Sequence, residues 1–166
     1  MGLFDTMKEP VFLKENSSAV EQIEKLKECY EKVNDEGKTL SDNDIKLLEV
    51  GIYGENQILF ELKNSHIPMA VLQDVYLEHQ GLTAQTDFMI FTKGFIFVVE
   101  CKNLVGSITI DNTGNFTRVF DYGKYKKKEG LYSPLTQNKR HLDLIKQKIL
   151  DRQINIIARK MAERIF

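Results

Sequence analysis

The chain is poor in cysteine and proline and has no tryptophan: two Cys, three Pro and no Trp occur among 166 residues. Cys29 and Cys101 show no CxxC spacing, which argues against a zinc site or a disulfide framework and is typical of a reducing cytoplasm. There is no run of about 18 apolar residues, so we expect no membrane span and no membrane partner. The first residues lack the basic and apolar regions of a secretory signal peptide. We therefore expect a cytoplasmic protein.

An apolar content of 42% and a charged content of 28% are those of a globular chain that can bury a core. The segment 18–21 fits a capping box, and apolar residues follow it at helical spacing as far as Gly37, which would cap the helix. Because this apolar stripe is narrow, we expect residues 1–40 to form an N-terminal helical appendage. Residues 41–166 would form the main domain. A helical pattern over 154–166 ends without a closing cap, so this domain is either truncated or naturally short, and both interpretations stay open.

The formal net charge of −1 hides an asymmetry along the chain. Residues 1–64 carry eight Lys or Arg against 14 Asp or Glu, whereas residues 118–152 carry ten against four. A basic second half favours contact with phosphates. Its densest part, Lys126-Lys127-Lys128, lies in a polar stretch over 121–133 that predicts a loop. A solvated loop explains a lysine triplet equally well, so both interpretations stay open here.

The most informative pattern is a hydrophobic hairpin with charged ends. If Lys93-Gly94 is a two-residue turn, the register places Asp87 opposite Glu100, with Cβ atoms about 5 Å apart. Lys102 then lies on the same face. Two carboxylates this close repel each other unless a proton or a cation lies between them, so the hairpin predicts a metal site. The alternatives are ordinary solvent-facing strand ends, or a three-residue loop with a bulge at Gly94 that changes the register.

A third carboxylate lies on the apolar stripe of a predicted helix over 41–64. The stripe has i, i+4, i+7, i+11, i+14 spacing and comprises Leu48, Ile52, Glu55, Leu59 and Leu62. A carboxylate in such a position costs free energy unless it is paired or bound to a cation. The alternative is that the stripe turns slightly and leaves Glu55 at its edge. Gly51 and Gly54 would let another element approach this helix closely.

The other segments alternate between strand and helix patterns. Strands are predicted over 70–77, 105–111 and 115–120. A helix is predicted from Pro134, with Ser133 as its N-cap, and it carries Gln137 and His141 beside an apolar face. Together these elements predict an α/β domain in which an α+β mixed sheet is flanked by helices.

With these residues assembled, the chain resembles the nuclease-related domain (NERD) family, a branch of the PD-(D/E)xK nuclease superfamily. The resemblance covers roughly residues 48–150 and is carried, in order, by Gly54-Glu55, Gln85-Thr86-Asp87, Glu100-Cys101-Lys102-Asn103 with Gly106, and Gln137-Asn138 with His141. The proline that names the superfamily motif is absent, because Thr86 precedes Asp87. The resemblance implies a restriction-endonuclease-like core and Mg²⁺-dependent hydrolysis of nucleic acid.

By this resemblance, the catalytic positions are Glu55, Asp87, Glu100, Lys102 and, in an accessory role, Gln137. Mg²⁺, for which Mn²⁺ can substitute, would be bound by Asp87, Glu100 and the Cys101 backbone carbonyl. Glu55 would contribute through a water or a second ion. Lys102 would orient or deprotonate the attacking water, and Gln137 would hydrogen-bond that water or the phosphate.

We expect nucleic acid, in the first instance DNA, as the partner. Its phosphates would contact Lys126, Lys127, Lys128, Lys139 and Arg140. The alternative function is a non-catalytic nucleic-acid-binding or regulatory module that keeps the nuclease fold. A homodimer, formed through the N-terminal helix or an incomplete sheet edge, is left open as well.

Overall fold

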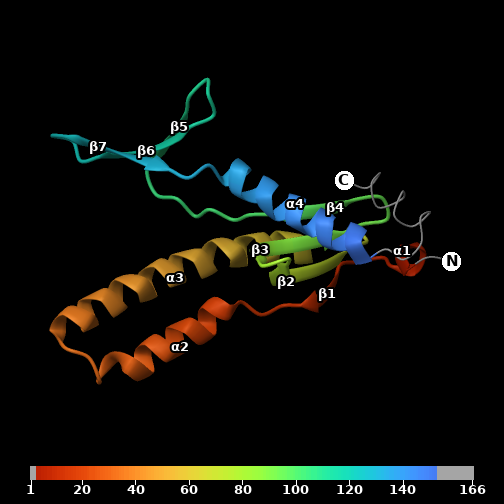
Figure 1. The fold of residues 1–166 in the computed structure, drawn as a ribbon, viewed down its shortest axis with the longest axis horizontal. Helices are drawn as coiled ribbons and strands as arrows, with labels where there is room; N and C mark the ends of the chain where they lie inside the picture. Colours follow the sequence, from red (N-terminus) through yellow and green to blue (C-terminus); the bar gives the residue numbers. More distant parts are fainter. Residues whose placement is uncertain (1–2, 153–166) are drawn as a thin grey trace.

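The computed structural model describes residues 3–152, which form helices around one mixed sheet together with a second, smaller sheet (Figure 1). The elements follow in the order α1 Leu3–Thr6, β1 Val11–Lys14, α2 Ser18–Tyr30, α3 Asp35–Lys63, β2 Ala70–His79, β3 Leu82–Phe91, β4 Ile96–Val99, β5 Ser107–Ile110, β6 Phe116–Asp121, β7 Lys126–Leu131 and α4 Pro134–Arg152. None of the described helices is both long enough and apolar enough to cross a membrane.

The main sheet has the strand order β1-β2-β3-β4. Strand β1 runs parallel to β2, whereas β2, β3 and β4 pair antiparallel, so the sheet is mixed. The second sheet, β5-β6-β7, is an antiparallel meander inserted between β4 and α4. This arrangement confirms the predicted α+β mixed sheet with flanking helices, and the strands predicted over 70–77, 105–111 and 115–120 are present.

The core lies between α3 and the main sheet. Its fully or nearly buried members are Met69, Val71, Phe88 and Ile90, against which Ile58, Leu59 and Leu62 of α3 pack, together with Phe12 and Val99. Helix α4 packs across β2, β3 and β4 and buries its own Leu144 and Ile145. Because successive strand residues point to opposite faces, each strand of this sheet can bring a polar side chain to either helix layer.

The N-terminal segment differs from the expected helical appendage. Helix α2 ends at Tyr30, and the side chain of Asn34 accepts a hydrogen bond from the Gly37 backbone N–H at 2.9 Å, which caps the start of α3. The predicted helix end near Gly37 is therefore wrong, because an Asn N-cap starts a new helix there instead. The boundary expected at residue 40 falls inside α3, and Val11–Lys14 adds a parallel strand to the main sheet.

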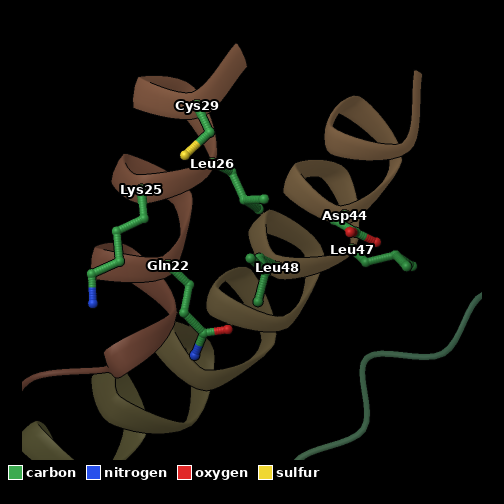
Figure 2. Close-up of a pocket in the computed structure, with 7 residues that line it drawn as sticks. All are labelled: Gln22, Lys25, Leu26, Cys29, Asp44, Leu47 and Leu48. Atoms are coloured by element: carbon green, nitrogen blue, oxygen red, sulfur yellow. The ribbon is translucent and has the colours of Figure 1, made fainter. Parts of the chain in front are cut away.

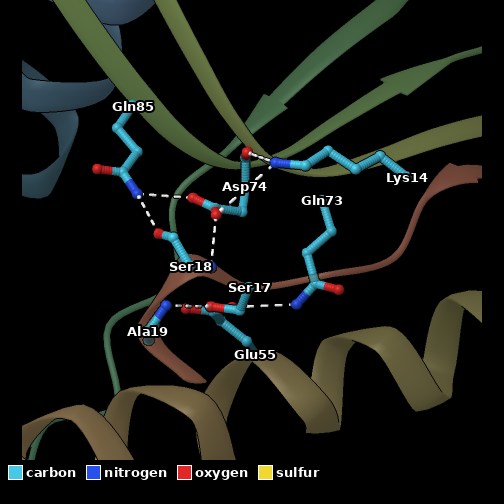
Figure 3. A network of polar contacts seen from close by, with 8 residues as sticks. All are labelled: Lys14, Ser17, Ser18, Ala19, Glu55, Gln73, Asp74 and Gln85. Carbon is cyan, nitrogen blue, oxygen red and sulfur yellow. Dashed lines mark hydrogen bonds and ion pairs between the residues drawn. The ribbon is translucent and has the colours of Figure 1, made fainter. Parts of the chain in front are cut away.

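A polar cluster around Asp74 holds this N-terminal segment on the sheet (Figure 3). Asp74 has a left-handed backbone (φ 52°), and its carboxylate accepts from the Ser18 backbone N–H at 2.7 Å and the Gln85 side chain at 2.6 Å. Lys14 forms an ion pair with it. Burial alone would raise the pKa of Asp74, but the hydrogen bonds from Gln85 and Ser18 and the Lys14 charge outweigh it and lower the pKa. The cluster therefore favours an ionised Asp74.

The predicted loop over 121–133 is wrong, because Lys126–Leu131 forms strand β7. Cross-strand charge pairs replace an apolar face: Lys126 bonds Asp121 at 3.0 Å, and Arg118 bonds Glu129 at 2.8 Å. Such pairs stabilise a strand that no core covers, and a strand of this kind shows no alternating apolar pattern. The helix predicted over 154–166 lies outside the described residues.

Helices α2 and α3 form a hairpin with a groove of about 570 Å³ between them (Figure 2). Leu26 and Leu48 point into the space between the helices, while Lys25 extends away from it. The residues that line the groove include neither Asp87 nor Glu100 of the β3–β4 hairpin, and they do not include Glu55. The groove is therefore separate from the three predicted site carboxylates.

Candidate active site

The β3–β4 hairpin has the predicted register. Phe88 pairs with Val99, and the turn is closed by the Thr92 backbone N–H donating to the Phe95 carbonyl at 2.9 Å, with Lys93-Gly94 as its two loop residues. Continuing the ladder by one residue places Asp87 opposite Glu100, at the end of the sheet where β4 stops. The bulge at Gly94 that would have changed this pairing is not formed.

Asp87 is half-buried at that end of the sheet. Its Oδ2 accepts a short hydrogen bond, 2.5 Å, from the Cys101 backbone N–H. Burial raises the pKa of Asp87 to about 6 in spite of this bond, and the charges of Glu100 and Glu55 add to the rise while Lys102 opposes it. The three predicted carboxylates are therefore close enough to influence one another electrostatically.

Glu100 has an enclosed carboxylate, with only 6% of its side chain exposed. Its Oε1 accepts hydrogen bonds from Lys102 Nζ at 2.5 Å and from Gln137 Nε2 at 2.8 Å. Its Oε2 is buried without a hydrogen-bond partner, and His141 Nδ1 lies 3.7 Å from it. A buried carboxylate oxygen without a donor is costly for an apoprotein and leaves a lone pair available to a ligand.

Glu55 reaches the site from α3. The residues of its stripe are all partly buried, as predicted from their spacing. Glu55 Oε2 accepts a hydrogen bond from Gln73 Nε2 at 3.1 Å, and Gln73 is itself 3% exposed (Figure 3). Since Gln73 belongs to β2, this bond fixes the Glu55 side chain relative to the sheet.

Close contact between α3 and the segment after β4 depends on Gly54. A Cβ at Gly54 would lie 2.8 Å from Asn103 Cβ and 3.0 Å from Cys101 Sγ. The Asn103 side chain donates to the Val50 carbonyl at 2.9 Å, which ties this segment to the helix. The pKa of the Cys101 thiol is raised, first by burial and then by the charges of Asp87 and Glu55, so this thiol stays protonated and serves packing.

Gly54→Ala is expected to destabilise the protein and displace Cys101 and Asn103, because overpacking costs about 1–3 kcal/mol and exceeds the gain of about 1 kcal/mol in helix propensity. Gly51→Ala is the matched control, since a Cβ there meets nothing within 4 Å. It should stabilise by about 1 kcal/mol. Chemical denaturation of the two variants measures both effects, and equal changes of stability would contradict the role of Gly54.

The basic residues predicted to meet phosphates are divided between two elements. Lys126, Lys127 and Lys128 lie on β7 of the second sheet, where Lys126 pairs with Asp121 and Lys127 with Glu129. Lys139 and Arg140 are exposed on α4, and the Arg140 guanidinium lies over the Tyr132 ring at 5.5 Å. Three of these basic residues thus lie in the second sheet and two lie near the start of α4. Their described ion pairs are with Asp121 and Glu129, and not with the carboxylates of the site.

Two supporting residues were not assigned a role in the predicted site, although Asn138 belongs to the motif that carries the family resemblance. Gln73 orients Glu55, and Asn138 anchors α4 by donating to the Val98 carbonyl at 2.9 Å. The signal for Gln73 is its place in an otherwise apolar strand, where a buried amide needs a partner. Asn138 lies directly after Gln137, and nothing in its spacing distinguishes the two.

Within the described residues, no three His, Cys, Asp or Glu side chains are gathered closely enough to hold a metal ion as they stand. Mg²⁺, however, keeps several waters and commonly takes only one or two carboxylates from a protein. The donor set fits that requirement: Asp87 and Glu100 supply hard oxygen ligands, and one oxygen of Glu100 lacks any donor. The chemistry of the residues is therefore compatible with a divalent cation.

Comparison with known protein families finds one match. A family model described as the nuclease-related domain matches residues 50–162. The matched range contains all three carboxylates together with Lys102 and Gln137. No curated protein and no solved structure matches the chain.

Proposed function

Because the chain belongs to the nuclease-related domain family, we propose that it is a metal-dependent nuclease that hydrolyses phosphodiester bonds of nucleic acid, with DNA as the expected substrate. The observation that carries the proposal is the pairing of Asp87, whose pKa is raised to about 6, with a buried Glu100 that keeps one oxygen free of donors. Carboxylates whose pKa values are raised by burial and by neighbouring charges are typical of functional sites.

Asp87 and Glu100 would hold Mg²⁺ or Mn²⁺, with Glu55 positioned by Gln73 to contribute through a water or a second ion. When bound, the cation supplies stabilisation of the charge that develops on the phosphate and lowers the pKa of a water. The Cys101 backbone N–H donates to the Asp87 carboxylate and helps to hold it in place. The Cys101 carbonyl remains a proposed additional ligand.

Lys102 and Gln137 both donate to the same oxygen of Glu100. They therefore fix the orientation of that carboxylate and direct its second oxygen away from themselves. Lys102 is 36% exposed, so its ammonium can also reach a phosphate oxygen or orient the water that attacks it. Gln137, on the first turns of α4, would hydrogen-bond the water or the phosphate.

A non-catalytic nucleic-acid-binding module is the second candidate, and the specific observation in its favour is that no group of three metal-binding side chains is assembled among residues 3–152. This alternative predicts salt-sensitive binding of nucleic acid without turnover in Mg²⁺ or Mn²⁺. Cleavage of DNA by purified protein in the presence of either ion, and its loss in EDTA, separates the two candidates.

Lys102→Ala is expected to lower metal-dependent cleavage by roughly a hundredfold, which is the lower end of the effect of a positioned acid–base group. Lys93→Ala is the matched control, because Lys93 is an exposed lysine at the other end of the same hairpin, bonded to Asp5. Single-turnover cleavage rates at saturating protein measure the difference. Equal rates for the two variants would contradict a catalytic role of Lys102.

A further inference from the structure

The second sheet, β5-β6-β7, contributes none of the proposed catalytic residues. The chain leaves the site after Lys102, forms β5, β6 and β7, and returns to the site at Gln137. In Figure 1 this sheet projects from one end of the molecule, beyond the start of α4. At its base the backbone of Gly106 (φ 101°) passes so close to β6 that a Cβ would lie 2.8 Å from the Val119 carbonyl oxygen. This close approach packs the start of β5 directly against β6, four residues after Lys102.

One face of the β6–β7 hairpin is a ladder of aromatic rings. The Arg118 guanidinium lies over the Phe120 ring at 4.6 Å. Phe120 stacks on Tyr122 at 6.2 Å, and Tyr122 stacks on Tyr125 across the turn at 5.0 Å. Tyr122 and Tyr125 are 55% and 63% exposed. Rings stacked in this way on a strand pair that no helix covers leave their outer faces open to a further planar group.

The same hairpin is basic. Residues 118–131 contain five Lys or Arg, namely Arg118, Lys124, Lys126, Lys127 and Lys128, against Asp121 and Glu129. Each acid bonds at least one of these bases, and Glu129 is shared by Arg118 and Lys127. Lys128 is exposed and has no ion pair within residues 3–152. The hairpin therefore presents positive charge beside its exposed rings.

We propose that the β6–β7 hairpin is a docking surface for single-stranded nucleic acid, on which bases stack on Tyr122 and Tyr125 while phosphates meet Lys128 and its neighbours. Stacking rings combined with a positive groove or edge are what single strands require. A duplex keeps its base faces within its own stack, so the exposed rings of this surface cannot stack on them. The proposal rests on the proposed nuclease function and narrows its substrate to a chain with an unpaired segment, delivered towards Glu100 along the base of the insertion.

A lipid surface and a protein partner fit this hairpin less well. Its tip carries tyrosines instead of the large aliphatic side chains that enter an acyl region. The acids Asp121 and Glu129 stand among the lysines, which weakens attraction to an anionic membrane. Stacked rings beside cations favour a ligand in which planar groups alternate with negative charges. A nucleotide chain is such a ligand, because its bases alternate with phosphates.

Tyr125→Ala tests the proposal. Binding of a fluorescent dT oligonucleotide of about 15 nucleotides is measured by anisotropy in EDTA, so that the result does not depend on turnover. The expected result is a Kd weakened by roughly 5- to 100-fold, with recovery in Tyr125→Phe, which keeps the ring. Tyr76→Ala is the matched control: Tyr76 is 61% exposed on β2 and has no ring partner among the described aromatics. It should bind as the wild type does.

Lys128→Ala should reduce the salt dependence of dT binding by about 0.7 in the slope of log K against log salt, whereas Lys25→Ala on α2 should not. A duplex of equal length should bind more weakly than dT. Unchanged dT binding in Tyr125→Ala, equal losses in Tyr76→Ala, or preference for the duplex or for anionic vesicles would overturn the proposal. Hydrolysis of bis(4-nitrophenyl) phosphate by the wild type in Mn²⁺ tests the proposed function separately, because this small diester needs no docking surface.

Discussion

Glu100→Gln is expected to lower metal-dependent cleavage by at least about 10³-fold, because a cation that loses a carboxylate ligand loses several kcal/mol of stabilisation at the transition state. The substitution conserves size and removes only the charge. Glu100 is enclosed, so no other described carboxylate can replace it without moving the Lys102 and Gln137 side chains that bond it. Metal binding should weaken in parallel with cleavage, which calorimetric titration with Mn²⁺ in the absence of DNA measures.

Glu129→Gln is the matched control for this result. Glu129 is a partly buried glutamate paired with Arg118 and Lys127 in the second sheet, so its neutralisation alters local charge without touching the carboxylate pair. We expect little change in Mn²⁺ affinity from Glu129→Gln. If Glu100→Gln binds Mn²⁺ as tightly as the wild type and cleaves DNA at a comparable rate, the assignment of this site is wrong.

Asp87→Asn is expected to abolish most cleavage, again by about 10³-fold, and at the same time to stabilise the metal-free protein near neutral pH. The reason is that the pKa of Asp87 is raised to about 6 by burial and by Glu100 and Glu55. Asparagine keeps an oxygen that can accept from the Cys101 N–H but removes the repelled charge. After allowance for solvent screening of a half-buried group, the gain is about 1–2 kcal/mol.

The pH dependence of this gain follows from linkage. A carboxyl whose pKa is higher in the folded state than in the unfolded chain binds more protons when folded, so its contribution to stability is present at low pH. That contribution is lost as the pH rises through about 6. Thermal unfolding in EDTA should therefore show Asp87→Asn well above the wild type at pH 7.5 and closer to it at pH 4.5. An Asp87→Asn variant that is less stable than the wild type at pH 7.5 would contradict the strain assigned to this carboxylate.

Asp74→Asn provides a control with the opposite sign. The pKa of Asp74 is lowered, since bonds from Gln85 and Ser18 and the charge of Lys14 outweigh burial. A group whose pKa is lowered on folding stabilises the folded state at a pH above its pKa in the unfolded chain. This contribution is lost as the pH falls through its pKa in the folded protein. Asp74→Asn should therefore destabilise the protein at pH 7.5. The pair of variants separates a carboxylate that serves the fold from one that is kept at a cost.

The sequence predicted the hairpin correctly because its determinants are local. The Lys93-Gly94 turn sets the register, and continuing the ladder by one residue places Asp87 opposite Glu100. Lys102 lies beyond the end of β4, and its hydrogen bond to Glu100 places it at the site. Glu55 was found in the same way, from the spacing of one helical stripe. Residues that act through neighbours in the chain, or through one repeating period, can be predicted from sequence alone.

The features that were missed either lack an apolar repeat or depend on distant partners. Strand β7 pairs with the adjacent β6, but cross-strand ion pairs replace the apolar alternation that marks a strand, which is why the basic segment 126–128 was expected in a loop. Strand β1 is a strand only because it lies beside β2. Gln73 gains its role from a helical residue 18 positions earlier in the chain, and no local pattern shows that partner.

The most direct test of the proposed metal site is a crystal structure of the protein soaked in Mn²⁺, with anomalous scattering used to locate the ion. We expect an anomalous peak between the carboxylates of Asp87 and Glu100, within coordination distance of the Glu100 oxygen that has no hydrogen-bond donor. The peak should be absent in Glu100→Gln. A fully occupied Mn²⁺ at another place, or no peak here at saturating Mn²⁺, would contradict the central claim.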